Sequence, residues 1–264
     1  MSLIIHHLQH SQSERIVWLC EELRGSVPGF DYKLEIHRRN PKTALAPPYL
    51  KDIHPAGTAP IVVDDTVQPR VVLAESQAIV EYLMQVHGQS RFSVSPGSQE
   101  YADYLSWYNF ANGSFQACLT RAGSIDLLIK GWKRMQEGRR KNTDNADEHT
   151  QTEADWQSAA DLDAMATPFR ARLSRRYDMI ESRLGHSRYL AGDNMTAADI
   201  MTVFSLTTMR GFLPYDLGPY PNILRYLHDI SRRPAYRRAL EKVEPGQVPM
   251  IEAQVQRFDF EVFK

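Results

Sequence analysis

Apolar residues recur with two different periods along the chain, and the change between them divides it into two parts. Between Phe30 and Ile36 every second residue is apolar, which is typical of a half-buried strand. The apolar runs 61–63 and 71–73 are separated by a turn that begins at Asp64-Asp65, and this spacing predicts a β-hairpin. Beyond residue 97 the apolar residues follow helical spacing, and the pattern carries no strand signal.

The order of the predicted elements indicates how the first part folds. It reads strand 3–8, helix 16–23 ended by Gly25, strand 30–36, a short helix 48–53, the hairpin, and a helix after Ser76. The strand–helix–strand unit favours a parallel strand pair, and the hairpin adds an antiparallel pair. We therefore expect an α/β domain that resembles thioredoxin over residues 1–87, a linker up to residue 97, and an all-α helical domain over residues 97–264.

One local signal stands out in the helical part. Thr196 and Asp199 have the spacing of a capping box, and Met195 and Ile200 lie where a hydrophobic staple would form. A carboxylate in a capping box has a structural task, so Asp199 is not a catalytic candidate.

Two further stretches of this part are less regular. Residues 137–155 are polar and charged, which predicts a solvated excursion between two helices; a basic interaction site is the alternative. The tail beyond Pro245 carries three phenylalanines, and whether it folds back over a cleft stays open at this point.

Composition and charge exclude several classes of function. The formal net charge is -1, which implies no nucleic-acid or anionic-membrane partner. The pattern predicts neither a transmembrane helix nor a signal peptide. Cys20 and Cys118 have no metal-binding spacing, and His6 and His7 would point to opposite faces of a strand, so no metal is expected. A reducing, cytoplasmic location is the natural interpretation.

Two residue pairs beside the hairpin suggest a binding site. Ala59-Pro60 precedes the first strand, and a cis bond there would leave the Ala59 backbone facing outward for a ligand. Glu75-Ser76 follows the second strand, where the N-terminus of a helix favours an anion. A backbone edge, an anion site and a carboxylate together suit an extended zwitterionic peptide.

These residues resemble a known site. Ala59-Pro60 followed by Glu75-Ser76-Gln77-Ala78-Ile79 is similar to the glutathione site of cytosolic glutathione transferases, in the fungal and bacterial subgroup typified by the first yeast glutathione transferase. The resemblance implies a cis proline, an Ala59 backbone that pairs with the cysteinyl part of glutathione, and a Glu-Ser pair that holds the γ-glutamyl end. It also implies the two-domain glutathione transferase fold, a homodimer, and glutathione as co-substrate.

A transferase of this kind must ionise a thiol, whose pKa is ordinarily about 8.5. A hydroxyl at the start of the first helix supplies a hydrogen-bond donor, and the helix dipole adds positive potential. The serine-type members carry their serine four residues before an arginine, and Ser11 stands in this relation to Arg15. Ser13 is the alternative, although it is better placed as an N-cap. The loop contains no tyrosine and no cysteine.

The remaining contacts are weaker predictions. His54 takes the place of the asparagine that the family usually has before the cis-proline loop, and Thr58 stands where many members have lysine. The sequence does not select a cation for the glycyl carboxylate of glutathione among Lys42, Arg38 and Arg39.

The second-substrate pocket is expected along the helix after the linker. Its candidate residues are Trp107, Tyr108 and Phe115, although an aromatic stripe also suits a core. Asn112 stands where the subgroup often has glutamate, which leaves its role open.

The sequence therefore predicts an enzyme that conjugates glutathione to an electrophile. A non-catalytic glutathione-binding or protein-interaction module on the same fold is the alternative. A serine hydrolase is disfavoured because the chain has no Gly-x-Ser-x-Gly motif near a strand end. Detoxification and a biosynthetic step are both compatible with these residues.

Overall fold

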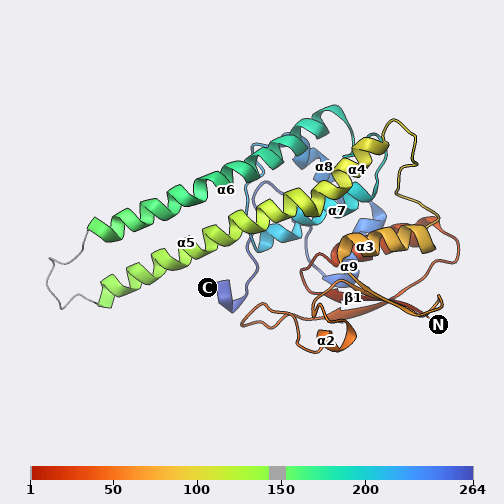
Figure 1. The fold of residues 1–264 in the computed structure, drawn as a ribbon, viewed down its shortest axis with the longest axis horizontal. Coiled ribbons are helices and arrows are strands. Elements are labelled where there is room, and N and C mark those ends of the chain that lie inside the picture. Colours follow the sequence, from red (N-terminus) through yellow and green to blue (C-terminus); the bar gives the residue numbers. More distant parts are fainter. Residues whose placement is uncertain (1, 143–152, 264) are drawn as a thin grey trace.

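A four-stranded mixed sheet forms the N-terminal part of the computed structural model, which describes residues 2–142 and 153–263 (Figure 1). The strands are β1 (Leu3–Leu8), β2 (Lys33–His37), β3 (Ile61–Asp64) and β4 (Val71–Ala74). Their order is β2-β1-β3-β4, with β1 parallel to β2 and antiparallel to β3, and β3 antiparallel to β4. The predicted parallel pair and hairpin are both present, although Asp64 belongs to β3 rather than to the turn.

Helices cover this sheet on both sides. They are α1 (Glu14–Ser26), α2 (Leu50–Ile53) and α3 (Ser76–Tyr82), and a π-helical turn, η1 (Leu83–His87), continues α3. In Figure 1, α2 lies on one side of the sheet and α3 on the other. The helix α1 forms because Ile16, Leu19 and Leu23 share one face, and all three are completely buried. It runs one residue past Gly25, where the sequence predicted its end.

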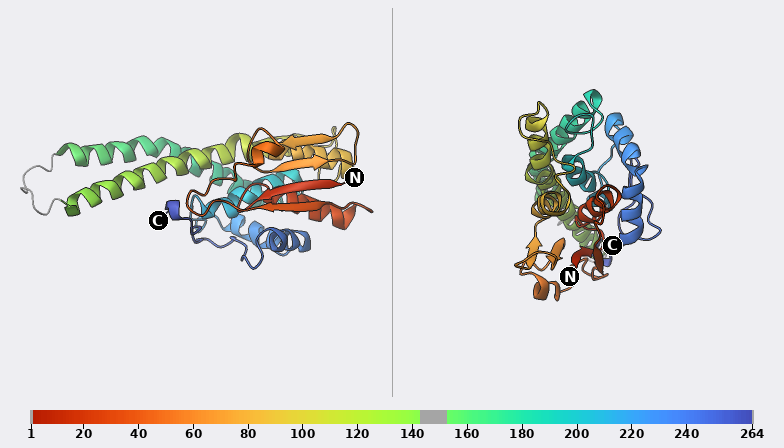
Figure 2. Two further views of the ribbon diagram at one scale, coloured as in Figure 1. Left: turned by 90° about the horizontal axis from the view of Figure 1, so that it is seen from below. Right: turned by 90° about the vertical axis from the view of Figure 1, so that its right-hand side faces the viewer.

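The rest of the chain is helical, and its two longest helices form a projecting pair. The elements are α4 (Tyr101–Phe110), η2 (Ala111–Gln116), α5 (Ala117–Asn142), α6 (Glu153–His186), α7 (Ala197–Leu206), η3 (Thr208–Gly211), α8 (Pro221–Ser231), α9 (Pro234–Val243) and η4 (Glu261–Phe263). The helices α5 and α6 lie side by side and extend well beyond the sheet (Figures 1 and 2). No helix among the described residues is long and apolar enough to cross a membrane.

The predicted polar excursion at residues 137–155 differs from the structure at both of its ends. Helix α5 continues to Asn142 and α6 already begins at Glu153, so both ends of the predicted excursion are helical. A helix that is already formed gains one backbone hydrogen bond for each added residue, so it can continue without an apolar face to bury. Residues 143–152 lie outside the described part of the chain.

The buried helix α7 begins as the sequence predicted. Thr196 and Asp199 form the capping box at its start. The Asp199 carboxylate also accepts hydrogen bonds from the Leu190 backbone N–H at 3.0 Å and from the Tyr226 hydroxyl at 3.0 Å. The carboxylate is thus fully engaged in holding the chain together, which agrees with a structural role.

The C-terminal tail returns to the loop that follows β1. The Phe258 backbone N–H donates to the Gly211 carbonyl, and the Phe258 ring stacks on His10 with ring centroids 3.9 Å apart. A Cβ atom on Gly211 would lie 2.4 Å from the Phe258 ring, so this approach requires glycine. The tail therefore covers the segment next to Ser11.

Candidate active site

The cis-proline segment differs in one respect from the expectation. The Ala59–Pro60 bond is cis, as predicted, and leads into β3. Ala59, however, is only 2% exposed. The backbone that was expected to face outward for a ligand is therefore covered.

Glu75 is held in an unusual backbone conformation at the start of α3. Its φ of 71° and ψ of 112° fall where non-glycine residues are rare. Such a conformation costs on the order of 1–3 kcal/mol and often marks a functional site. The exposed Glu75 side chain lines a pocket of about 540 Å³, to which Gln12, Gln116 and Arg121 also contribute. A carboxylate and a guanidinium in one polar pocket suit a zwitterionic ligand, and the sequence had not pointed to Arg121.

A buried arginine network, which we call the Arg15 network, lies beneath this pocket. The Arg15 guanidinium is 1% exposed. It donates to Asn112 at 2.8 Å, Gln116 at 2.6 Å, Ser76 at 3.2 Å and Gln12 at 3.2 Å. These partners come from the loop after β1, from α3 and from η2, so one side chain connects both parts of the fold. Asn112 thereby has a role that the sequence left open.

Ser76 is not available in the way that the sequence predicted. Its hydroxyl accepts from Arg15 and Asn112 and donates to Gln12. A hydroxyl has one hydrogen and two lone pairs, so all of its capacity is used. A carboxylate that binds to the Ser76 hydroxyl would have to displace one of these partners.

The charges next to the Arg15 network favour an anion. Burial lowers the pKa of Arg15 to about 9, which leaves the guanidinium charged at neutral pH. Burial also raises the pKa of the neighbouring Glu14 carboxyl to about 7, so this carboxyl is only partly ionised there. The Glu14 carboxyl accepts a hydrogen bond from Thr208. Together with the N-terminus of α1, this leaves net positive potential at the start of the helix.

The two candidate serines lie together but are not equivalent. The Ser11 carbonyl accepts from the Glu14 backbone N–H at the start of α1, and its hydroxyl lies 2.6 Å from that of Ser13. Ser11 is 5% exposed, whereas Ser13 is completely buried. Ser13 occupies the N-cap position with a helical backbone, and its side chain does not cap the helix as predicted. Instead, its hydroxyl accepts from the Leu8 backbone N–H and bonds Nδ1 of His7.

The aromatic residues that were predicted to line the second-substrate pocket make contacts with other residues of the protein. Phe115 is completely buried and stacks on Phe110, and the half-buried Trp107 packs edge-on against Phe110. The Tyr108 hydroxyl donates to the Gln77 carbonyl at 2.8 Å. The prediction was therefore wrong for Phe115, which packs in the core, whereas Tyr108 also lines a groove between α3 and α4.

A different pocket lies beside the loop between β1 and α1, which contains His10. It has a volume of about 430 Å³ and is bounded by His10 and by tail residues between Gln247 and Asp259. Burial lowers the pKa of His10 to about 4, so its ring is neutral. No sequence signal points to this pocket, because its two walls are more than 200 residues apart.

Two other residues that were considered for glutathione binding, His54 and Arg39, interact with nearby parts of the chain. His54 ends α2, and its Nδ1 accepts from the Ala56 backbone N–H. The Arg39 guanidinium donates to the carbonyls of Gln9 and Ala44 and lies over the Phe212 ring.

The other two candidate cations are more accessible. Arg38 is 56% exposed at 3.4 Å from Glu244, and Lys42 is exposed. The structure thus leaves Arg38 and Lys42 better placed than Arg39 for an anionic group.

Comparison with known proteins agrees with this arrangement. The family model described as "Glutathione S-transferase, N-terminal domain" matches residues 11–86, and "Glutathione S-transferase, C-terminal domain" matches residues 163–234. Glutathione S-transferase 3 of Schizosaccharomyces pombe is 29% identical over 97% of this chain and 93% of its own length. Glutathione S-transferase 1 of Saccharomyces cerevisiae is 26% identical over 90% and 94%.

Solved structures of glutathione S-transferases are also similar to this chain. A glutathione S-transferase from Actinobacillus pleuropneumoniae is 28% identical, with a TM-score of 0.65 over 92% of this chain and 93% of that one. A sphingomonad glutathione S-transferase in complex with glutathione shares the fold at 17% identity, with a TM-score of 0.57 over 90% and 98%. Both the sequence and the two-part fold, a thioredoxin-like domain and an all-helical domain, agree with one family. The chain therefore belongs to the glutathione S-transferase family, whose activity is the transfer of glutathione.

Proposed function

We propose that this protein conjugates glutathione to an electrophile and that Ser11 holds the glutathione sulfur as a thiolate. The position of Ser11 carries the proposal, because its hydroxyl is the more exposed of the two at the start of α1. A hydrogen bond to the sulfur, the helix dipole and the charged Arg15 all favour the ionised thiol.

Each of the two substrates can be assigned to one pocket. We assign the γ-glutamyl end of glutathione to the pocket beside Glu75, where Glu75 faces its ammonium group and Arg121 its carboxylate. We assign the electrophile to the pocket between His10 and the tail. In this arrangement both parts of the fold contribute residues to each of the two pockets.

A turnover assay with glutathione and a panel of electrophiles, combined with direct glutathione binding, tests the proposal. Turnover with at least one electrophile is expected. Binding without turnover of any electrophile would instead favour a non-catalytic binding module.

Replacement of Glu75 by alanine is expected to weaken glutathione binding. A hydrogen bond to a charged group contributes roughly 1.5–3 kcal/mol, which corresponds to an increase of about 10- to 100-fold in Kd. Isothermal titration calorimetry measures this change. The control is Glu241→Ala, which removes an exposed glutamate in the last turn of α9. An unchanged Kd for Glu75→Ala would rule out the assigned role.

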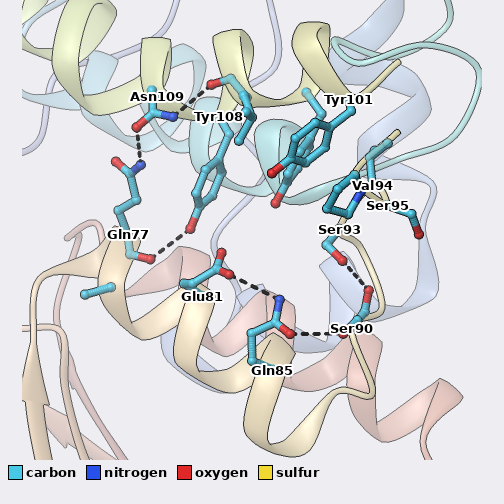
Figure 3. Close-up of a pocket in the computed structure, with 14 residues that line it drawn as sticks. Gln77, Glu81, Gln85, Ser90, Ser93, Val94, Ser95, Tyr101, Tyr108 and Asn109 are labelled. Carbon is cyan, nitrogen blue, oxygen red and sulfur yellow. Dashed lines mark hydrogen bonds between the residues drawn. The ribbon is translucent and has the colours of Figure 1, made fainter. Parts of the chain in front are cut away.

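We also propose that the protein is a homodimer that uses a groove between α3 and α4. The groove has a volume of about 600 Å³ and is lined by α3 side chains such as Glu81 and by the α4 residues Tyr101, Tyr104 and Leu105 (Figure 3). Leu105 is 40% exposed, and the buried Tyr104 hydroxyl has no hydrogen-bond partner among the described residues. The groove joins the two parts of the fold, where the family resemblance places the partner subunit.

Light scattering at micromolar concentration should give twice the mass of one chain. Leu105→Glu should reduce the mass to that of a monomer, because it places a charge against the partner. Leu128→Glu should keep the dimer, since Leu128 is 74% exposed on α5, outside the groove. A monomer mass for the wild type would contradict this proposal.

A further inference from the structure

A continuous row of buried polar groups runs inward from Ser11 to the end of α9. The Ser11 and Ser13 hydroxyls lie 2.6 Å apart, and the Ser13 hydroxyl lies 2.9 Å from Nδ1 of His7. On the other side of the imidazole ring, Nε2 of His7 lies 3.8 Å from the Glu244 carboxylate. None of these side chains is more than 7% exposed. We call Ser11, Ser13 and His7 the Ser11–His7 chain.

Two arrangements of the hydrogens along this chain concern a bound thiol, although the Ser13 hydroxyl can also donate to the Leu8 carbonyl at 3.5 Å. The Ser13 hydroxyl oxygen already accepts from the Leu8 backbone N–H at 3.1 Å, and a single hydrogen fits between the two serine oxygens. If Nδ1 of His7 is bare, Ser13 donates to it and Ser11 donates to Ser13. Ser11 can then only accept a hydrogen from a bound thiol.

The second arrangement serves a thiolate. When Ser11 donates to an anionic sulfur, Ser13 must donate to Ser11. Nδ1 of His7 must then carry the hydrogen that points to Ser13. Because Nε2 faces the Glu244 carboxylate, it keeps its own hydrogen. A second hydrogen at Nδ1 therefore makes the ring an imidazolium and couples ionisation of the thiol to protonation of His7.

We propose that His7 takes up the thiol proton of glutathione through Ser13 and Ser11. This inference rests on the role proposed above for Ser11. The S–H bond breaks as its proton passes to the Ser11 oxygen, Ser11 passes its own hydrogen to Ser13, and Ser13 passes its own to Nδ1 of His7. The electron pair of the S–H bond stays on sulfur. The products are a thiolate hydrogen-bonded by Ser11 and an imidazolium beside Glu244. His7 touches no substrate atom and is a positioning residue that acts through the serines.

The surroundings of His7 suit a proton acceptor. The charged and titratable groups that face it are Glu244, Arg38, Arg39, His10 and His37. Burial lowers the pKa of His7, so the ring is neutral before glutathione binds, while Glu244 acts in the opposite direction. Burial raises the pKa of Glu244, but its contacts with His7 and His10 outweigh this effect and place it below the ordinary value. An ionised Glu244 therefore faces Nε2 and stabilises the imidazolium.

The destination of the proton distinguishes this proposal from direct ionisation. If His7 keeps the proton, a thiolate forms without any release of protons to the solvent. If Ser11 alone lowered the thiol pKa, each thiolate formed would release one proton.

The test mixes glutathione with the wild-type protein at pH 7 in weak buffer that contains a pH indicator. Ultraviolet absorbance of the thiolate is recorded at the same time. The proposal predicts thiolate absorbance with no matching proton release. Release of about one proton for each thiolate would overturn it.

His7→Asn provides the matched variant, because asparagine keeps a polar atom near the position of Nδ1 but does not take up a proton at this pH. Its kcat/KM should fall about tenfold for each pH unit below the pKa of the bound thiol, because each thiolate formed then releases its proton to the solvent. The wild type should stay nearly flat between about pH 6.5 and about pH 8, because the proton remains within the protein. If the pH dependence of kcat/KM for His7→Asn matched that of the wild type, the proposal would be overturned.

His6→Asn is the control, since His6 lies on the same strand and bonds His37 instead of the Ser11–His7 chain. Circular dichroism checks that each variant is folded. Ser13→Ala, which interrupts the chain at its centre, replaces His7→Asn if that variant does not fold.

Ser11→Ala distinguishes the role proposed for His7 from the role proposed for Ser11. If Ser11→Ala loses the thiolate while His7→Asn keeps the wild-type profile, only the role of His7 fails. If Ser11→Ala also has no effect, the function proposed for Ser11 fails as well.

Discussion

Ser11→Ala is expected to lower kcat/KM for glutathione conjugation at neutral pH by about 10- to 100-fold. The substitution removes the hydroxyl that donates to the sulfur, and a hydrogen bond to a charged group contributes roughly 1.5–3 kcal/mol. Glutathione affinity should change little, because the γ-glutamyl end is held elsewhere. The deficit should shrink as the pH approaches about 8.5, where the free thiol ionises without help.

The pH dependence of kcat/KM for the wild type and the variant measures this effect. Ser26→Ala is a suitable control, since Ser26 lies at the opposite end of α1 and its hydroxyl donates to the Glu22 carbonyl within its own helix. If Ser11→Ala reproduced the wild-type profile, backbone N–H groups rather than Ser11 would stabilise the thiolate.

Arg15→Met should destabilise the fold by about 3–5 kcal/mol, the range for removal of one partner from a buried charged network. Methionine has a similar length but cannot donate hydrogen bonds, so Gln12, Ser76, Asn112 and Gln116 would lose their common partner. Since these residues also shape the pocket beside Glu75, glutathione binding should weaken as well.

Urea unfolding measures this loss of stability. Arg24→Met is the matched control, because Arg24 forms an exposed ion pair with Asp31 and such pairs contribute about 1 kcal/mol or less. A loss below 1 kcal/mol for Arg15→Met would show that the Arg15 network does not hold the two parts of the fold together.

Features with short-range causes could be predicted from the sequence. The hairpin, the helix after Ser76 and the capping box at Thr196 depend on residues only a few positions apart, and all three are present. The cis Ala59–Pro60 bond was expected from the family resemblance and is also present.

Features with long-range causes could not be predicted. The Arg15 network brings together residues about 100 positions apart. The Ser11–His7 chain lies next to Glu244, which is more than 200 positions away in the sequence. Ser13 looked like a cap because its residue type suits one, but its backbone is helical and its hydroxyl turns towards His7. The aromatic stripe of α4 has the same spacing whether it lines a pocket or a core, and only packing decides between them.

Titration of the thiol of bound glutathione shows whether Ser11 stabilises the thiolate. Ultraviolet difference spectroscopy follows the thiolate in wild-type and Ser11→Ala protein, each saturated with glutathione. We expect a thiolate at neutral pH in the wild type, and in the variant a thiolate that appears only as the pH approaches about 8.5. The same thiolate at neutral pH in both proteins would contradict this expectation.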